Sequence, residues 1–236
     1  MFKIHYFLFI VLLNFSCNID KYKSKNYNFT YSNMLIDSNL IVDSVILKTY
    51  LPYKIFLDSV LNKNISFSPK FIEKSRPESE LSNLIADACY NFIKNKYKID
   101  FCLLNFGGIR SSMPKGNITI RDIYEIMPFE NKLVIVELSY DNFKFLLEYL
   151  NEINGQPISG LKININNNII SHNLSSNSSY KILTSDYLSS GGDNMFFLKD
   201  SISFINTQHK IRDVLIDYCT NYDTLEYKLD QRFHYE

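Results

Sequence analysis

The chain has 236 residues, 46% of them hydrophobic, which is enough for one large domain or two small ones with a substantial core. Its 25 basic and 25 acidic residues give a formal net charge of zero, so composition provides no electrostatic basis for binding nucleic acid. Cys89, Cys102 and Cys219 lie in apolar contexts without metal-ligand spacing, and we expect them to be buried free thiols.

The first residues have the features of an export signal. The apolar run over residues 6–13 is too short to span a bilayer as a helix but has the length of a signal-peptide core. Ser16 then precedes Cys17, which resembles the lipid-modified first residue of a bacterial lipoprotein. We therefore expect residues 1–16 to be a signal peptide, residues 17–37 to be a lipidated polar tether, and the protein to be anchored at the cell envelope. Ordinary signal cleavage and an uncleaved anchor remain alternatives.

Hydrophobic spacing predicts the elements of the first half of the chain. Residues 43–61 carry apolar side chains at helical spacing, and Pro52 should kink or divide that helix. A short extended piece is expected at 65–67. The clearest helix starts at residues 77–79, after which apolar residues recur at i, i+3, i+4 and i+7. It leads into a buried strand over 101–104.

The second half alternates strands with helices. Strands are predicted where β-branched or alternating apolar residues occur, at 117–120, 132–138, 158–165, 169–170 and 180–184. Helices are predicted at three places, namely residues 121–126, a segment capped by Ser139 and a last segment capped by Thr207. Because the alternation is irregular and shows no internal repeat, we predict one α+β domain over residues 38–236, with mixed sheets covered by helices.

Two double-glycine turns each follow a predicted apolar strand. The first is Asn105-Phe106-Gly107-Gly108-Ile109-Arg110, and the second ends in Gly191-Gly192-Asp193. Glycines at a strand end let backbone N–H groups approach a ligand without an intervening Cβ, and the arginine adds a planar charge suited to carboxylate, phosphate or a stacked ring. A lone turn of this kind is usually no more than a tight turn with a solvated arginine. Since two such loops follow strands, we expect them to converge on one site.

Five sequence blocks extend this pattern. They are ELSNLIADA from Glu80, NFGGIR from Asn105, MPFEN from Met127, ISGL from Ile158, and DYL with GGD from Asp186. In order and spacing they resemble the C-terminal domain of the 5′-nucleotidase / UDP-sugar hydrolase family, from about residue 43 to residue 198. In that family this domain binds the nucleoside of the substrate, while a separate N-terminal metallophosphatase domain holds two metal ions and performs the hydrolysis.

The resemblance implies roles for individual side chains. Phe129 and Tyr187 look like the two aromatics that sandwich the base, although the family commonly has Phe at the second position. Asn105 is similar to the residue that contacts the base, Arg110 to the arginine near the ribose and phosphate, and Asp193 to the carboxylate that takes the ribose hydroxyls. Two facing rings suit a flat purine, whose stacking is worth roughly 1–3 kcal/mol per contact. Ordinary core packing of both rings is the alternative.

Four glycines complete the candidate substrate-binding set: Gly107, Gly108, Gly192 and Gly160. The first three belong to the two turns, and Gly160 looks like the family's glycine beside the base. Two departures from the family stand out. Phe106 occupies a position where the family often has a third glycine, and Arg76 lies out of register with a further arginine of the family.

The catalytic half of the family has no counterpart in the sequence. Two-metal hydrolysis needs several His, Asp and Asn ligands, and the four histidines here are isolated from one another: His5, His172, His209 and His234. We therefore expect no catalytic residues and no cofactor in this chain, a nucleotide or nucleoside as its ligand, and two divalent metals in a separate metallophosphatase chain. The alternatives are a stand-alone envelope lipoprotein that binds nucleotides or nucleosides, and a degenerate member kept as an interaction module.

Overall fold

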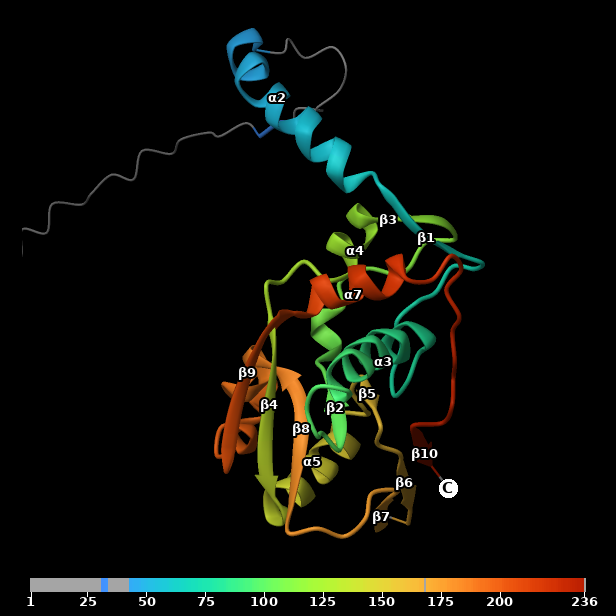
Figure 1. Cartoon of the computed structure of the whole chain (residues 1–236), viewed down its shortest axis with the longest axis vertical. Coiled ribbons are helices and arrows are strands. Elements are labelled where there is room, and N and C mark those ends of the chain that lie inside the picture. Colours follow the sequence, from blue (N-terminus) through green and yellow to red (C-terminus); the bar gives the residue numbers. More distant parts are fainter. Residues whose placement is uncertain (1–30, 34–42, 168, 236) are drawn as a thin grey trace, which may run out of the picture. The chain divides into compact units, whose positions relative to one another are not determined.

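The computed structural model describes residues 31–33, 43–167 and 169–235 (Figure 1). The chain divides into two units, residues 1–47 and 48–236, and each is considered by itself. Cys17 and the whole predicted signal peptide lie outside the described residues. In the part of the chain that is described, none of the helices combines the length and the hydrophobicity needed to cross a bilayer.

A mixed five-stranded sheet forms the centre of the second unit (Figure 1). Its strands, in spatial order, are β5 (Ile158–Ser159), β2 (Phe101–Leu103), β8 (Ser179–Ser185), β4 (Lys132–Ser139) and β9 (Ser203–Lys210). The β2–β8 pair is parallel, and the other neighbouring pairs are antiparallel. The three central strands are rich in buried apolar residues, as expected for strands covered on both faces.

Helices and loops cover both faces of this sheet. One core lies between the sheet and α3 (Glu80–Lys94), α4 (Ile120–Ile126) and α7 (Ile211–Thr220), and the other lies between the sheet and α5 (Tyr140–Glu152). Successive residues of a strand point to opposite faces, so Phe101 and Cys102, neighbours in β2, enter different cores. The predicted α+β fold is therefore confirmed.

Smaller elements complete the architecture. They are α2 (Ser44–Leu61), the antiparallel pair β1 (Asn64–Ser68) and β3 (Gly116–Thr119), the three-stranded sheet of β10 (Phe233–Tyr235), β6 (Ile163–Asn166) and β7 (Ile169–His172), the short helix α6 (Asp186–Ser189), and the 3₁₀ turns η1 (Phe106–Gly108), η2 (Gly192–Asn194) and η3 (Phe196–Leu198). Of these, η1 follows β2, whereas α6 and η2 follow β8. All three belong to the site described below.

The helix starts are fixed by local side-chain caps. Ser79 accepts a hydrogen bond from the backbone N–H of Ser82, whose hydroxyl in turn accepts from the backbone N–H of Ser79. Ser139 caps α5 as predicted, because its hydroxyl accepts from the N–H of Asn142. Each cap satisfies an otherwise unpaired N–H group and stabilises its helix by about 1 kcal/mol.

Two predicted elements differ in the structure. The single strand expected at 158–165 is two strands, β5 and β6, because the chain turns at Gly160, which has a φ of 83°. Thr207 does not cap the last helix. It lies inside β9, where its hydroxyl donates to the carbonyl of Leu133 at 2.7 Å. Thr207 is in a strand because β9 pairs with β4, which comes from a distant part of the chain. The capping prediction considered only neighbouring residues and therefore missed this pairing.

The helix α2 is not divided at Pro52, which leaves a kink as the remaining expectation for this proline. It runs through Pro52 as one element, and none of its residues is buried. Asp43 caps it, since its carboxylate accepts from the N–H groups of Val45 and Ile46.

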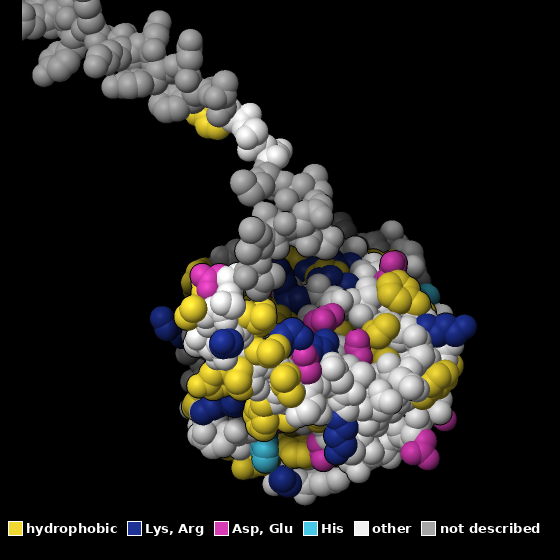
Figure 2. Space-filling view, turned by 90° about the horizontal axis from the view of Figure 1, so that it is seen from above, with side chains coloured by type: hydrophobic (Ala, Val, Ile, Leu, Met, Phe, Trp, Pro, Cys, Tyr) yellow, Lys and Arg dark blue, Asp and Glu magenta, His cyan; other side chains and the backbone are white. Residues whose placement is uncertain are grey.

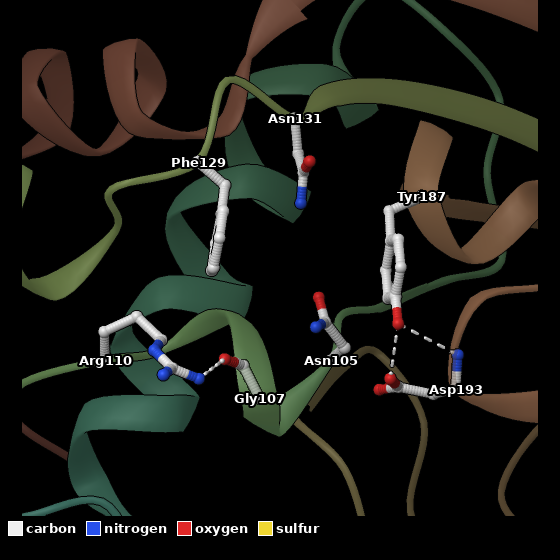
Figure 3. Close-up of a pocket in the computed structure, with 7 residues that line it drawn as sticks. All are labelled: Asn105, Gly107, Arg110, Phe129, Asn131, Tyr187 and Asp193. Atoms are coloured by element: carbon white, nitrogen blue, oxygen red, sulfur yellow. Dashed lines mark hydrogen bonds between the residues drawn. The ribbon is translucent and has the colours of Figure 1, made fainter. Parts of the chain in front are cut away.

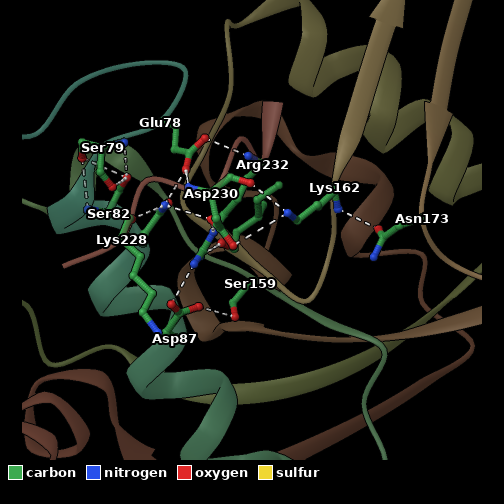
Figure 4. A network of polar contacts seen from close by, with 12 residues as sticks. Glu78, Ser79, Ser82, Asp87, Ser159, Lys162, Asn173, Lys228, Asp230 and Arg232 are labelled. Atoms are coloured by element: carbon green, nitrogen blue, oxygen red, sulfur yellow. Dashed lines mark hydrogen bonds and ion pairs between the residues drawn. The ribbon is translucent and has the colours of Figure 1, made fainter. Parts of the chain in front are cut away.

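A buried arginine fastens the C-terminal segment to α3 and β5 (Figure 4). Arg232 is 5% exposed, pairs with Asp87 at 2.7 Å and with Asp230 at 2.8 Å, and donates to the carbonyl of Ile158. The carboxylate of Glu78 accepts from the backbone N–H groups of Asp230 and Arg232. A buried charge is tolerated when it is paired and hydrogen-bonded in this way, so the network secures the segment that leads to β10.

Charged side chains of both signs mix on the surface. On the face shown in Figure 2, lysines and arginines lie among acidic and hydrophobic side chains. Exposed pairs such as Arg121–Asp58, whose atoms are 2.6 Å apart, contribute at most about 1 kcal/mol each. This mixture agrees with the zero net charge of the sequence.

Candidate ligand-binding site

Three loops meet at one edge of the central sheet because of its topology. β2 and β8 are parallel neighbours, with Phe101 opposite Ile182, so both strands end at the same edge. β4 is antiparallel to β8, with Leu133 opposite Ser185, so β4 begins at that edge. The two loops that follow β2 and β8 therefore meet the loop that precedes β4.

These loops enclose a cavity of about 360 Å³ (Figure 3). It is lined by Asn105, Gly107, Arg110, Phe129, Asn131, Tyr187 and Asp193. Figure 3 shows the rings of Phe129 and Tyr187 facing each other across the open space, with Asn105 and Asn131 pointing between them from opposite sides. The volume lies in the range of small-molecule sites, and apolar walls with a few polar groups are typical of them.

Both rings are partly open to solvent. Phe129 is 46% exposed and Tyr187 is 43% exposed, whereas Phe143 in the core has no exposed surface. Ordinary core packing is therefore excluded for the two rings. They are walls of a cavity with free faces on which a flat ligand can stack.

The first loop is held by neighbouring backbone and side chains. The N–H of Phe106 donates to the Gln156 side chain at 2.6 Å, and the N–H of Arg110 donates to the carbonyl of Ile126 at 2.8 Å. The guanidinium of Arg110 lies 5.9 Å from the centroid of the Phe129 ring. It therefore lies beside that ring, where it can meet a negative group of a ligand.

Phe106 does not line the cavity, and two cations lie close to its ring. The ammonium of Lys74 is 4.4 Å from its ring centroid and the guanidinium of Arg76 is 4.6 Å from it. Lys74 also donates to the carbonyl of Ile109. Burial, and after it the positive charges of Arg110 and Arg76, lowers the pKa of Lys74. The two departures from the family, Phe106 and Arg76, thus contact each other.

A buried arginine positions the loop that carries Phe129. Arg212, 3% exposed, stacks on the ring of Tyr124 at 3.9 Å and pairs with Glu130. Its guanidinium also donates to the carbonyls of residues 127–129 at distances between 3.1 and 3.5 Å. No motif in the sequence pointed to Arg212, because its partners lie more than 80 positions earlier in the chain.

The third loop places a carboxylate beside the second ring. Asp193 has a left-handed backbone conformation with a φ of 50°, and its carboxylate accepts from the Tyr187 hydroxyl at 2.8 Å. The hydroxyl of Tyr149 donates to the carbonyl of Asp193. The hydrogen bond to Asp193 is the main cause that raises the pKa of Tyr187.

The turn glycines have different positions. Gly107 lines the cavity. Gly108 and Gly192 do not, but a Cβ at Gly108 would lie 2.9 Å from the Asn105 side chain and one at Gly192 would lie 2.6 Å from the Tyr187 ring. These two glycines leave room for the side chains that form the walls.

The structure does not bring Gly160 to this cavity, contrary to the prediction. β5 is antiparallel to β2, with Leu103 opposite Ile158, so Gly160 lies past the end of β5 that is remote from Asn105. Its backbone approaches the ring of Tyr90, and it lines a different cavity. Gly160 has a left-handed φ, a backbone conformation that favours glycine, and this accounts for the glycine at this position.

Two polar residues of the site were missed. Asn131 lines the cavity, and the Gln156 side chain accepts a hydrogen bond from the first loop. Asn131 belongs to the MPFEN block, which could have identified it. The signal for Gln156 is weaker, since its contact depends on how β5 pairs with β2.

The described titratable groups form no metal centre. Among residues 31–33, 43–167 and 169–235, no three His, Cys, Asp or Glu side chains form a cluster that could hold a metal ion. Cys89, Cys102 and Cys219 are buried and unpaired, as predicted. Burial raises the pKa of the Cys89 and Cys219 thiols to about 12, so both remain protonated.

Comparison with known proteins identifies the family. Residues 62–200 match the C-terminal domain of 5′-nucleotidase, and the chain belongs to this family. A 5′-nucleotidase of Vibrio parahaemolyticus is 25% identical over 223 residues, which cover 86% of this chain and 39% of that protein. A 5′-nucleotidase of Vibrio cholerae is 24% identical over 215 residues, covering 83% of this chain and 38% of that protein.

Solved structures share the fold. The 5′-nucleotidase precursor from Thermus thermophilus superposes with a TM-score of 0.69 at 23% identity, over 80% of this chain and 42% of that one. A 5′-nucleotidase from Staphylococcus aureus gives 0.64 at 16% identity, over 85% of this chain and 45% of that one. The chain thus spans about two fifths of the length of the curated relatives it matches.

The exposure of the two rings predicts how much each contributes to stability. Phe129→Ala and Tyr187→Ala should each lower the free energy of unfolding by less than about 1.5 kcal/mol, because half-exposed rings leave no buried cavity. Phe143→Ala, the control in the core, should cost about 3–5 kcal/mol. Urea unfolding followed by circular dichroism measures all three. A loss above 3 kcal/mol for either cavity ring would mean that it is a core residue.

Proposed function

We propose that this chain is the nucleotide- or nucleoside-recognising domain of a 5′-nucleotidase-type phosphohydrolase. The observation that carries the proposal is the pair of facing, half-exposed rings, Phe129 and Tyr187, in a cavity of a member of this family. A nucleobase has two flat π-faces and can stack on both rings at once. Stacking of this kind contributes roughly 1–3 kcal/mol per base.

The other lining residues suit the remaining parts of a nucleotide. Asn105 and Asn131 each offer a donor and an acceptor to the edge of a base between the rings. Asp193 offers a carboxylate to ribose hydroxyls, and Arg110 offers a planar cation to phosphate. The cavity therefore presents stacking surfaces, neutral polar groups and one charge of each sign.

We further propose that hydrolysis is carried out by a separate two-metal metallophosphatase chain. In support, the chain spans about two fifths of relatives that are named 5′-nucleotidases, and its described residues hold no cluster of metal ligands. The second candidate is a stand-alone envelope protein that binds nucleotides or nucleosides without a catalytic role. It requires only the cavity described above.

We also propose that the protein is exported and anchored at the bacterial cell envelope through Cys17. The support is the N-terminal sequence, in which a short apolar run and Ser16 precede the cysteine. A lipid chain at this position would attach the polar tether to a membrane and leave the ligand-binding domain outside it.

The cavity rings should determine ligand affinity. Phe129→Ala and Tyr187→Ala should each weaken binding of adenosine and AMP by about ten- to a hundredfold, because each removes one stacking face. Isothermal titration calorimetry on the purified chain measures this. Phe145→Ala is the matched control, since Phe145 is 57% exposed on α5 and does not line the cavity. Unchanged affinity in both ring variants, or no binding by the wild type up to millimolar ligand, would refute the proposed site.

The isolated chain should not hydrolyse AMP, UDP-glucose or bis(p-nitrophenyl) phosphate with Mn²⁺, Zn²⁺ or Mg²⁺, because its described residues offer no ligand set for two metals. Adding a metallophosphatase chain from the same source should produce turnover that Phe129→Ala reduces. Turnover by the isolated chain that EDTA abolishes would disprove the proposal that a separate chain carries out the hydrolysis. If the added chain gives no turnover while nucleosides bind, the stand-alone binding protein is the correct description.

The membrane anchor can be tested at one residue. Cys17→Ala should release the protein from the membrane fraction and abolish labelling with a fatty-acid analogue, because the lipid is the proposed attachment. Fractionation and labelling of cells that express either form measure this, with Cys219→Ala as a control cysteine. A variant that stays with the membrane would indicate an uncleaved N-terminal anchor.

A further inference from the structure

The hydroxyl of Tyr187 contacts Asp193 twice (Figure 3). It donates to carboxylate Oδ1 at 2.8 Å and accepts from the backbone N–H of the same residue at 3.2 Å. The ring wall and the carboxylate are thus joined through one phenolic oxygen. A phenylalanine at this position would keep the ring and lose both contacts.

The backbone of Asp193 is also held by neighbouring groups. The backbone of Asp193 is left-handed, with φ 50° and ψ 35°, a conformation that is uncommon outside glycine but that aspartate adopts more readily than most residues. The hydroxyl of Tyr149 holds its carbonyl, and the absence of a side chain at Gly192 lets the Tyr187 ring lie against the turn. Two hydroxyls, one from α5 and one from α6, therefore hold one aspartate at the cavity wall.

The contact leaves one carboxylate oxygen available. Oδ1 is taken by Tyr187, whereas Oδ2 accepts no hydrogen bond from the described side chains and backbone. Asp193 lines the cavity, and Figure 3 shows its carboxylate next to the Tyr187 hydroxyl, at the end of that ring. An oriented, unshared carboxylate oxygen is a strong acceptor for a ligand hydroxyl.

We propose that the Tyr187 hydroxyl is a specificity-determining group, which holds the Asp193 carboxylate in position to accept the hydroxyls of a ribose. The inference rests on the proposed function and adds a positioning residue to it. The same hydrogen bond raises the pKa of Tyr187, so the phenol remains a donor throughout the physiological range. The ring stacks on the base while its hydroxyl aligns the group that reads the sugar.

Tyr187→Phe tests this directly, because it removes the hydroxyl and keeps the stacking ring. Adenosine and AMP should bind about two- to tenfold more weakly, since the ligand must then order a free carboxylate. Binding of 2′,3′-dideoxyadenosine, which has no ribose hydroxyls, should not change. Tyr140→Phe is the matched control, because Tyr140 is 46% exposed and does not line the cavity. In an Asp193→Asn background, Tyr187→Phe should have little further effect on adenosine.

The possible outcomes separate the two proposals. If the wild type binds neither nucleoside up to millimolar concentration, the proposed function fails and the sugar selectivity fails with it. If the wild type binds both, but Tyr187→Phe weakens both equally or strengthens adenosine binding, the positioning role alone is overturned. A ligand-free measurement is amide hydrogen exchange, in which the Asp193 N–H should exchange faster in Tyr187→Phe than in Tyr140→Phe. Equal exchange in the two variants would also overturn the positioning role.

Discussion

The parallel pairing of β2 with β8 is the constraint on which the site depends. Two neighbouring parallel strands end at one edge of a sheet, so the loops after Phe101–Leu103 and after Ser179–Ser185 must emerge together. The antiparallel β4 begins at the same edge and adds the Phe129 loop. A shift of one residue between β2 and β8 would exchange the side chains that enter the two cores, so burial on both faces fixes the register and, with it, the site.

The three loops at this edge have irregular backbone, and side chains from elsewhere satisfy its polar groups. Gln156 accepts from the first loop, Arg212 donates to three carbonyls of the second, and Tyr149 donates to the third. Unpaired buried backbone groups are costly, so these contacts favour one arrangement of each loop. A cavity held in one arrangement before a ligand arrives loses less conformational entropy on binding.

The character of the cavity agrees with the composition of the chain. Its walls are two rings and two asparagines, and one arginine and one aspartate supply its charges. Recognition of a nucleotide here would therefore depend on stacking and on directed hydrogen bonds more than on a basic surface, which the zero net charge does not provide. Residue type alone does not show whether an aromatic ring packs in the core or lines a cavity. For Phe129 and Tyr187, their exposure in the structure decides between these two possibilities.

Local patterns in the sequence determined the helices other than α6, most strands and the family. Apolar spacing placed α3 and α5, Ser139 marked a cap, and five blocks identified the C-terminal domain of 5′-nucleotidase. Contacts between distant segments were decided only by the tertiary structure. Arg212 holds carbonyls more than 80 residues away, Thr207 joins a strand instead of capping a helix, and strand pairing puts Gly160 outside the cavity. Capping and periodicity act within a few residues and can be read from the sequence, whereas these contacts depend on strand register and on which segments share a core.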